Sequence, residues 1–374
     1  MLKRLPVTVI TGFLGAGKTT LLRELLKNSG QRLAVMVNEF GSVGLDGDLI
    51  RSCGFCPDDE LEDRLVELNN GCLCCTVQDD FLPTMERLLE RANTLDGIVV
   101  ETSGLALPRP LLQALEWPDI RSRVRVNGVV TVVDGEALAA GSPVADPAAL
   151  EKQREEDPSL DHLTAIDELF KDQLQAGDLV LISRADCMSD LDLARVSDHL
   201  KQGCRAGTPT LAMERGGVDP QLVLGLEHHP EHKDQHHDHD HHHDHDHDDH
   251  DHGHHHDHTH VEVKGSVIRF EGDVDRSSLE QRLKDLVGPY HVVRLKGRVW
   301  LSDKAIPLQI QMVGPRLDSW FEAAPDTAWK PSCSCGLDLV VLGFSDDHSE
   351  SLANDLQKLV SATPATPNTP AAIS

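Results

Sequence analysis

The sequence predicts an α/β protein: a mostly parallel sheet covered by helices, followed by a smaller α+β domain. Up to about residue 226, short β-branched runs alternate with amphipathic segments, as is typical of parallel strands with helices on both faces. Beyond residue 260, strand-like runs outnumber helical ones. Between these parts, residues 227–260 are mostly His and Asp, which marks a boundary.

Five apolar runs in the first part have the length and composition of buried strands. They lie at residues 7–10, 33–37, 98–100, 129–133 and 179–182. The amphipathic segments between them predict helices at residues 19–28, 161–173 and 191–201. A polar stretch at residues 141–161 is expected to be a long surface loop.

The second part is expected to contain five strands and two helices. The strands are predicted at residues 267–270, 292–295, 299–301, 308–313 and 339–342, with turns between them. The helices are predicted at residues 278–287 and 352–360, each with one apolar face.

Composition sets the expected domain boundaries. Of the 22 histidines in the chain, 18 lie within residues 227–260, and a stretch without an apolar face cannot offset its ordering entropy by burial. We therefore expect a first domain at residues 1–226, a disordered linker at 227–260, a second domain at 261–360 and a disordered tail at 361–374.

The charge balance argues against several classes of partner. The 374 residues include 35 Lys and Arg against 62 Asp and Glu, for a net charge of −27, and 3% are aromatic. Nucleic acids and anionic membranes attract basic faces, so neither is expected as a partner. No run approaches the roughly 18 apolar residues of a transmembrane helix, and no signal-peptide pattern is evident. Several of the nine cysteines are adjacent or one residue apart, which favours metal-binding thiols in a reducing cytoplasm.

The run GFLGAGKT at residues 12–19 fits the phosphate-binding pattern G-x-x-x-x-G-K-[ST] between a predicted strand and a predicted helix. Glycines let backbone N–H groups turn toward a phosphate, Lys18 is expected to reach the β- and γ-phosphates, and Thr19 to ligate Mg²⁺. An ordinary glycine-rich turn is the alternative. The predicted nucleotide-binding residues of this loop are Gly12, Gly15, Ala16, Gly17, Lys18, Thr19 and Thr20.

A second motif, GIVVETSG at residues 97–104, places Glu101 at the carboxyl end of a predicted strand. Ligand sites in parallel sheets collect at that edge. We predict that Glu101 holds the hydration shell of Mg²⁺ and that Gly104 senses the γ-phosphate through its N–H. Together with Lys18 and Thr19, Glu101 is a predicted catalytic residue; a surface acid that ends a strand is the alternative.

The run SRAD at residues 183–186 follows the last predicted strand, where P-loop GTPases carry N-K-x-D. The Asp186 carboxylate can accept two N–H bonds from guanine that adenine does not offer. Ser183 and Arg184 replace Asn and Lys, so the match is degraded, and a helix cap is the alternative. Ser183, Arg184 and Asp186 are predicted to bind the nucleotide.

Three thiols lie within four residues in NGCLCCTV at residues 70–77. Such thiolates select soft or borderline metals, among them Zn²⁺, Cu⁺ and tetrahedral Co²⁺. Cys72 and Cys74 alternate with Leu73, which would place both on one face of an extended segment. A reactive or buried cysteine patch is the alternative.

With these motifs the chain resembles the CobW-type P-loop GTPases, which are metallochaperones and metal-insertion factors. The matching runs are VITGFLGAGKTTLL, VNEFGSVGLDGDL, ELNNGCLCCTVQDDFLPTM, IVVETSGLALPRPLL, VVTVVDG, ELFKDQLQAGDLVLISRAD, VVRLKGRVW and QMVGPRLDSWF. They leave out the His tract, the loop near 141–161 and the tail. The sequences of the runs ELFKDQL and VGPRLDSW look closest to those of the cobalamin-pathway CobW proteins.

The resemblance implies a P-loop GTPase domain, a smaller C-terminal CobW domain and a metal held at C-x-C-C under the control of Mg·GTP. It implies that Cys72, Cys74 and Cys75 are the metal ligands. It places Glu39 in the switch, near the metal and the nucleotide. Ser42 stands where relatives often have an acid.

Further metal ligands are concentrated in the His tract, where a flexible run of imidazoles predicts many modest sites and a buffering role. His239, His241, His243 and His245 are its representative auxiliary ligands; a solvated linker is the alternative. Cys53 with Cys56 and Cys333 with Cys335 are further thiol pairs, for auxiliary binding or metal transfer. Cys187 and Cys204 are isolated and are expected to be structural.

The sequence therefore predicts a cytoplasmic GTPase that binds a transition metal in its Mg·GTP state and releases it on hydrolysis to a client metalloprotein or a cobaltochelatase. The sequences of the motifs favour Co²⁺ for cobalamin biosynthesis, and a Zn²⁺ chaperone for zinc-limited cells is the alternative. Passive metal storage is a rival of another class. Slow intrinsic hydrolysis is expected, because no arginine finger is evident. The sequence carries no signal for an oligomeric state.

Overall fold

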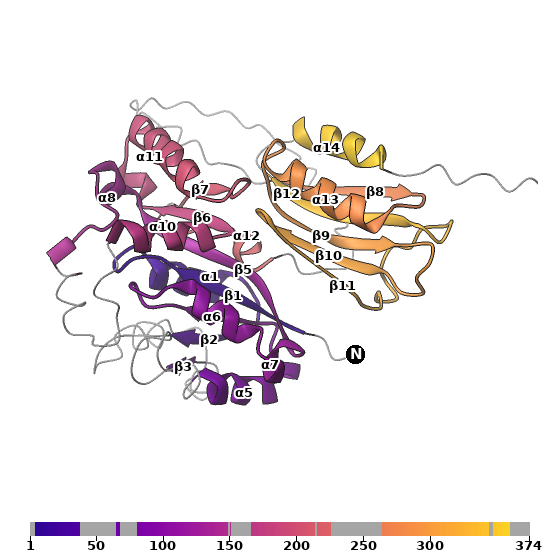
Figure 1. Cartoon of the computed structure of the whole chain (residues 1–374), viewed down its shortest axis with the longest axis horizontal. Helices are drawn as coiled ribbons and strands as arrows, with labels where there is room; N and C mark the ends of the chain where they lie inside the picture. Colours follow the sequence, from indigo (N-terminus) through magenta and orange to yellow (C-terminus); the bar gives the residue numbers. More distant parts are fainter. Residues whose placement is uncertain are drawn as a thin grey trace, which may run out of the picture.

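The computed structural model describes residues 4–37, 65–67, 81–148, 150, 166–213, 215–225, 264–343 and 347–359. Within these residues the chain forms two sheets, each with its own helices (Figure 1). One has seven strands in the order β3-β2-β4-β1-β5-β6-β7, and the other has five in the order β11-β10-β9-β12-β8. The expected fold class, a helix-covered parallel sheet with a smaller α+β domain, is confirmed.

The first sheet is parallel in each of its strand pairs. Its strands are β1 (Leu5–Thr11), β2 (Leu33–Val37), β3 (Leu65–Glu67), β4 (Gly97–Glu101), β5 (Val124–Asp134), β6 (Leu179–Ser183) and β7 (Thr210–Ala212). Its helices are α1 (Lys18–Asn28), α5 (Leu82–Glu90), α6 (Pro108–Leu115), α7 (Pro118–Arg121), α8 (Gly135–Ala139), α10 (Ile166–Ala176), α11 (Asp190–Gly203) and α12 (Pro220–Leu224). Short 3₁₀ turns η2 (Ala92–Thr94) and η3 (Ala185–Cys187) complete it.

Strand alternation divides the apolar side chains between the two faces of this sheet. In β2, Leu33, Val35 and Val37 belong to a core with α1 and α12, whereas Ala34 and Met36 belong to a core with α5, α6 and α7. Because successive side chains of a strand point to opposite faces, an unbroken apolar run is what a sheet covered on both sides requires. A third cluster packs α10 and α11 against β5 and β6.

The five strands predicted in the first part are all present; the one at 33–37 has the predicted bounds, and the other four are longer than predicted. The helices predicted at 19–28 and 191–201 are confirmed as α1 and α11. The third predicted helix is described from Ile166 onward as α10. The short strands β3 and β7 and the helices α5 to α8 and α12 were not predicted. Val144 and Leu150 are 3% and 1% exposed, so the described part of the predicted loop, residues 141–148 and 150, is partly buried.

The second sheet is antiparallel and packs against two helices. Its elements are β8 (Lys264–Glu271), α13 (Arg276–Val287), β9 (Val292–Trp300), β10 (Leu308–Val313), β11 (Arg316–Phe321), β12 (Gly336–Gly343) and α14 (Asp347–Gln357). Figure 1 shows both helices on one side of the sheet. Strand β11 was not predicted.

The prediction of two separate strands at 292–295 and 299–301 was wrong, because β9 runs unbroken through Gly297. A Cβ at Gly297 would lie 2.1 Å from the Asp338 carbonyl oxygen. The glycine therefore allows β9 and β12 to approach closely, and it does not mark a turn.

Buried ionic contacts join the two sheets. Asp178, just before β6, has a side chain with no exposed surface, and it pairs with Arg205 and with Arg316 of β11. Its carboxylate also accepts the Val129 N–H at 2.8 Å. On the other side, Arg294 of β9 donates to backbone carbonyls of α12.

The helices of the described ranges are all too short or too polar to cross a lipid bilayer.

We expect Asp178→Ala to destabilise the fold by about 3–5 kcal/mol, because it leaves two partly buried guanidinium groups without their carboxylate. Denaturant unfolding followed by tryptophan fluorescence measures the change. Asp198→Ala is the matched control: Asp198 pairs with Lys201 on the surface of α11, so its loss should change stability by less than about 1 kcal/mol. Equal effects of the two substitutions would show that Asp178 has no special role.

Candidate nucleotide-binding site

The predicted nucleotide-binding residues lie at one edge of the parallel sheet, where β1, β4, β5 and β6 end. Ile10 is in register with Glu101, and Asp134 with Ser183. The segments that follow these strands contain the glycine loop, Gly104 and the SRAD run. Ligands of open α/β sheets bind in the crevice at this edge.

The loop from β1 to α1 has a backbone that requires glycine. Gly12 has φ of +139°, and a Cβ there would lie 2.1 Å from the Val132 carbonyl oxygen. Gly17 has φ of +100° and is the N-cap of α1, and no side chain within the described residues caps this helix. The N-terminus of α1 therefore lies directly after the glycine loop, and the helix dipole favours an anion there.

Lys18 is 7% exposed, and its Nζ donates a hydrogen bond to the Phe13 carbonyl oxygen at 3.0 Å. The Phe13 ring stacks on Phe170 of α10 with 5.9 Å between the ring centroids. This contact packs the loop against the core of the domain. An ammonium held along the loop in this way is placed to reach phosphates lying in it.

Thr19, in the first turn of α1, contacts Glu101 at the end of β4. The Thr19 hydroxyl donates to Glu101 Oε1 at 2.9 Å, and Glu101 is 3% exposed. The alternative of a surface acid at Glu101 is therefore wrong. A hydroxyl and a carboxylate are hard oxygen donors of the kind that Mg²⁺ prefers, so the two residues fit the ion that a nucleoside triphosphate would bring.

Gly104 lies directly against the glycine loop. A Cβ on Gly104 would come within 2.5 Å of the Leu14 backbone nitrogen, so a larger residue would push the two segments apart. Gln173 of α10 fixes this segment from the other side: its Nε2 donates to the carbonyls of Gly104 at 3.2 Å and Ala106 at 3.3 Å. Motif analysis missed Gln173, although an amide among the apolar residues of a buried helix face was a usable signal.

The SRAD run is also adjacent to the glycine loop. Arg184, with φ of +55°, pairs with the buried carboxylate of Asp134 and donates to the Gly15 carbonyl at 3.3 Å. Ser183 directs its hydroxyl to the Val133 carbonyl at 3.1 Å, and its Cβ lies 3.5 Å from where a Cβ of Gly17 would be. Asp134 was not predicted as a site residue, yet it holds Arg184 beside the loop.

Asp186 is exposed in η3, and its carboxylate accepts the Arg215 N–H at 3.4 Å. Its position after β6 leaves the carboxylate accessible to a ligand at this edge. Thr20 is exposed and lies against Gly216, where a Cβ would be 2.5 Å from Thr20 Cγ2. Ala16 is 1% exposed and packs into the core beneath the loop.

The predicted ligands of the transition metal lie outside the described residues: Glu39, Cys72, Cys74, Cys75, His239, His241, His243 and His245. Cys53 and Cys56 do as well. Within the described ranges, no group of three or more His, Cys, Asp or Glu side chains is arranged to hold a metal.

The four thiols that the structure describes are free. Cys333 is exposed and donates its S–H to the Cys335 carbonyl at 3.1 Å. Burial is the first cause that raises the pKa of Cys335, followed by Asp273 and Cys333. Burial also raises the pKa of Cys204 to about 11, as expected of a structural thiol, whereas Cys187 is exposed.

Two family models match the chain, one for the CobW/HypB/UreG nucleotide-binding domain over residues 6–211 and one for the cobalamin synthesis protein cobW C-terminal domain over residues 263–360. The chain belongs to the CobW family. The first match spans the parallel sheet and the site described above, and the second spans the antiparallel sheet.

Relatives in this family are similar over most of the chain. A zinc chaperone CobW from Sinorhizobium sp is 42% identical over 348 residues, 92% of this chain and 94% of the relative. One from Pseudomonas aeruginosa is 42% identical over 362 residues, 95% of this chain and 92% of the relative. A zinc-regulated GTPase metalloprotein activator 1 from Schizosaccharomyces pombe is 38% identical over 187 residues, 49% of this chain and 38% of the relative.

We expect Glu101→Gln to reduce the Mg²⁺-dependent gain in GTP affinity by about 10- to 100-fold, because an amide holds the ion and its hydration shell less well than a carboxylate. Affinity for GDP without Mg²⁺ should stay nearly unchanged, since the loop N–H groups remain. Titration with a fluorescent nucleotide, with and without Mg²⁺, measures both. Glu90→Gln, at the exposed end of α5, is the matched control; an unchanged Mg²⁺ dependence in the Glu101 variant would contradict the assignment.

Proposed function

We propose that this CobW-family chain is a GTP-dependent metallochaperone. It binds a transition metal through Cys72, Cys74 and Cys75 when Mg·GTP occupies the glycine loop, and it releases the metal to a client protein when GTP is hydrolysed to GDP and phosphate. The observation that supports this most directly is the strand order β3-β2-β4-β1, because β3, which precedes the thiols in the sequence, ends at the edge of the sheet that holds the phosphate loop.

The register of the strands makes this argument specific. Val37 at the end of β2 is aligned with both Glu67 at the end of β3 and Glu101 at the end of β4. Cys72 follows Glu67 by five residues, which span at most about 18 Å. Strands β3 and β1 are three spacings apart, or about 14 Å. The chain length therefore permits the thiols to approach the phosphate loop.

Nucleotide control rests on residues that the structure describes. When bound, Mg²⁺ supplies charge neutralisation at the β- and γ-phosphates, and Thr19 and Glu101 hold it in place. Lys18 and the N–H groups of the loop bind the phosphates, and Gly104 lies close enough to the loop to contact the terminal one. Asp186 accepts the N–H groups of guanine. Loss of the γ-phosphate removes contacts at Gly104, and a segment ordered by those contacts relaxes.

Glu39 follows Val37 by two residues, so we place it in the segment that responds to the nucleotide. The thiols must lose protons to bind a metal, so capture releases protons and weakens at low pH. Intrinsic hydrolysis is proposed to be slow, since Arg184, the cation that the described residues bring to the loop besides Lys18, has its guanidinium paired with Asp134.

The names of the relatives support Zn²⁺ as the cargo. The sequences of the motifs favoured Co²⁺ for cobalamin biosynthesis, and the name of the second matching domain also mentions cobalamin synthesis. Tetrahedral thiolate sites accept both ions, so we propose Zn²⁺ and retain Co²⁺ as the alternative cargo. The client is a metalloprotein, or a cobaltochelatase if the cargo is Co²⁺. Adjacent thiols stay reduced in a cytoplasm, the location we propose.

Metal and nucleotide should tighten each other's binding, by about 5- to 150-fold if the coupling is typical of allosteric proteins. The coupling is measured by letting the protein compete with a chromophoric chelator for Zn²⁺, in the presence of a non-hydrolysable GTP analogue or of GDP. The same titration with Co²⁺ tests the alternative cargo. Cys74→Ser should abolish the tight site. Cys333→Ser, in the second domain, is the control and should retain it. Equal Zn²⁺ affinity in the two nucleotide states would refute the proposal.

Deletion of the His tract separates this function from passive storage. Replacing residues 228–260 with a Gly/Ser linker of equal length should remove the weak, numerous Zn²⁺ sites and leave one tight site that still responds to GTP. A storage protein would instead lose nearly all its capacity, and what remained would be indifferent to nucleotide. Zn²⁺ stoichiometry after equilibrium dialysis distinguishes the two outcomes.

A further inference from the structure

A polar cavity of about 320 Å³ lies between the two sheets, at the edge of the parallel sheet opposite the phosphate loop. Arg4 and Pro6 at the start of β1, and Arg125 and Asn127 in the first half of β5, line one side of it. Strand β1 has seven residues between this edge and the glycine loop, a separation of roughly 20 Å. A nucleotide bound at the loop therefore leaves this cavity open.

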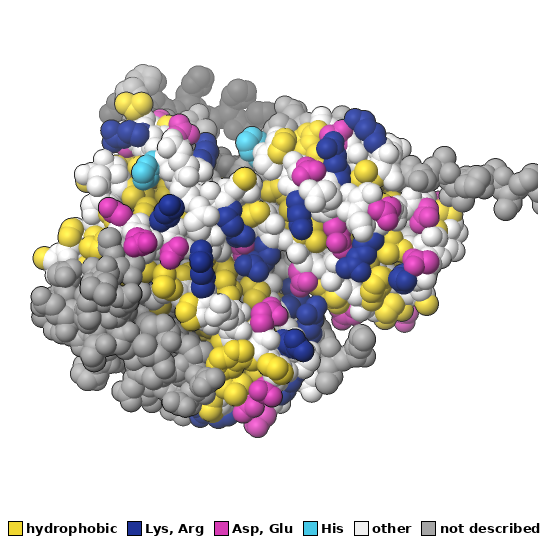
Figure 2. Space-filling model, in the orientation of Figure 1, with side chains coloured by type: hydrophobic (Ala, Val, Ile, Leu, Met, Phe, Trp, Pro, Cys, Tyr) yellow, Lys and Arg dark blue, Asp and Glu magenta, His cyan; other side chains and the backbone are white. Residues whose placement is uncertain are grey.

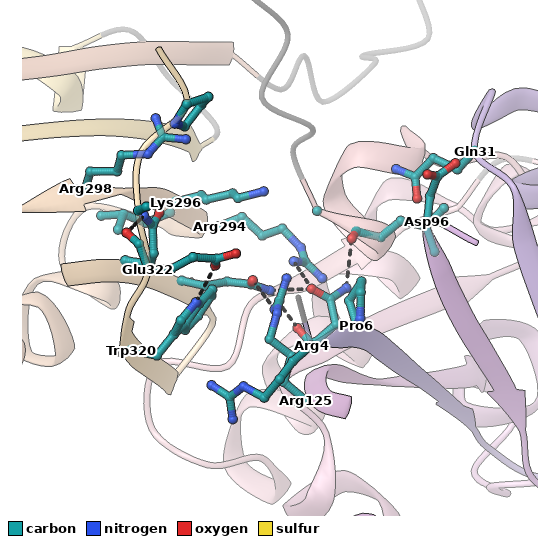
Figure 3. Close-up of a pocket in the computed structure, with 18 residues that line it drawn as sticks. Arg4, Pro6, Gln31, Asp96, Arg125, Arg294, Lys296, Arg298, Trp320 and Glu322 are labelled. Carbon is teal, nitrogen blue, oxygen red and sulfur yellow. Dashed lines mark hydrogen bonds between the residues drawn. The ribbon is translucent and has the colours of Figure 1, made fainter. Parts of the chain in front are cut away.

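Strand β9 lines the other side with cations at alternate positions. Arg294, Lys296 and Arg298 line the cavity, while the neighbouring residues Leu295 and Val299 belong to the apolar core beneath. Figure 3 shows Lys296 and Arg294 extending from this strand toward the parallel sheet. Like-charged side chains on one strand face lie only about 7 Å apart at the backbone, and they repel one another.

Positive charge predominates in this cavity, although the whole chain carries a net charge of −27. Arg4, Arg125 and the three cations of β9 line it against two carboxylates, Asp96 and Glu322. Figure 2 shows Lys and Arg side chains gathered where the two parts of the molecule meet on this face. The excess is a property of this site and not of the overall composition.

The carboxylates of this region have their own partners. Asp96 is held by both nitrogens of the Arg32 fork, at 2.8 and 3.1 Å, and Glu322 accepts the Trp320 indole N–H at 2.7 Å. Asp338 of β12 is in register with Arg298 of β9, and its carboxylate accepts a hydrogen bond from Arg269 Nε at 2.7 Å. Each carboxylate is thus shared with a partner outside β9, although, against the larger effect of burial, Asp338 and Glu322 still raise the pKa of Arg298.

Arg298 is the clearest sign of an incomplete site. It is 5% exposed, and its Nε has no hydrogen-bond partner among the residues that the structure describes. Burial lowers its pKa, and burial followed by repulsion from Arg125 lowers the pKa of Arg294 to about 9. Arg294 directs donors to the carbonyls of Leu222 and Val223, whereas the Nε of Arg298 has no acceptor among the described residues. A buried guanidinium N–H without an acceptor is costly, and an oxyanion in the cavity would satisfy it.

We propose that this cavity binds a small oxyanion with at least two negative charges, a phosphate or a dicarboxylate, between Lys296 and Arg298 on the antiparallel sheet and Arg4 and Arg125 on the parallel sheet. Guanidinium groups offer forked donors that match such oxygens. The volume is at the low end of ligand sites in proteins, which favours a small anion over a peptide. Because its ligands come from both sheets, the anion links them.

The test is isothermal titration of the full-length protein loaded with Mg²⁺ and a non-hydrolysable GTP analogue, at constant ionic strength, with inorganic phosphate in one arm and malonate in the other. The analogue fills the phosphate loop, including the γ-phosphate position, so anion binding there does not contribute, and chloride is the blank. We expect saturable binding in at least one arm, and the arm that binds identifies the oxyanion as phosphate or carboxylate. Arg298→Leu should weaken it by about tenfold or more, the effect of losing a charge-assisted contact.

Arg282→Leu is the matched control: Arg282 pairs with Asp355 between α13 and α14, and its removal makes the same charge change away from the cavity. It should leave anion affinity unchanged. Lys296→Gln, at a half-buried position, is a second variant that decides the outcome if Arg298→Leu does not fold, as judged by GDP binding. No saturable binding in either arm, or equal weakening by the control, overturns the proposal. Neither result affects the zinc–GTP coupling, which is measured at the other edge of the sheet.

Discussion

The contact between Thr19 and Glu101 connects the first turn of α1 to the end of β4 and so determines the geometry of the whole nucleotide edge. Glu101 is buried at the end of a strand, so its carboxylate needs a donor or a cation. Thr19 supplies the donor and positions the glycine loop beside β4. Gly104 and the SRAD run then reach the same loop because their strands end at the same edge. Strands β2 and β3 end at this same edge, because β3 is in parallel register with β2 and β2 with β4.

A second constraint is the burial of charge where the two sheets meet. Asp178 is satisfied by two arginines and a backbone N–H, and Arg294 by helix carbonyls and Asn127. Such groups contribute little net stability, but an unpaired one is strongly unfavourable, so they specify one docking geometry. Lys296 and Arg298 line the neighbouring cavity, where five cations face two carboxylates. The nucleotide edge and the cation-lined cavity therefore lie at opposite ends of the parallel sheet.

Local sequence was a good guide where one periodicity dominated. Apolar runs such as residues 33–37 predicted strands because a sheet covered on both faces buries every position. The prediction failed at Gly297, because a glycine between two apolar runs reads as a turn, whereas here it allows close strand packing. Gln173 and Asp134 were missed for a related reason: their partners lie far away in the sequence, and no local pattern shows a buried polar contact of that kind.

The sequence by itself determined the fold class, the phosphate loop and the identity of the acid at the end of β4, because each depends on short-range spacing and on backbone conformations that only glycine adopts. Only the tertiary structure decided that Glu101 is buried against Thr19, that Gln173 holds the segment around Gly104, and that alternate cations of β9 face a cavity at the opposite edge. Burial and partner choice arise when distant strands are brought together, and that proximity is not encoded in any single stretch of residues.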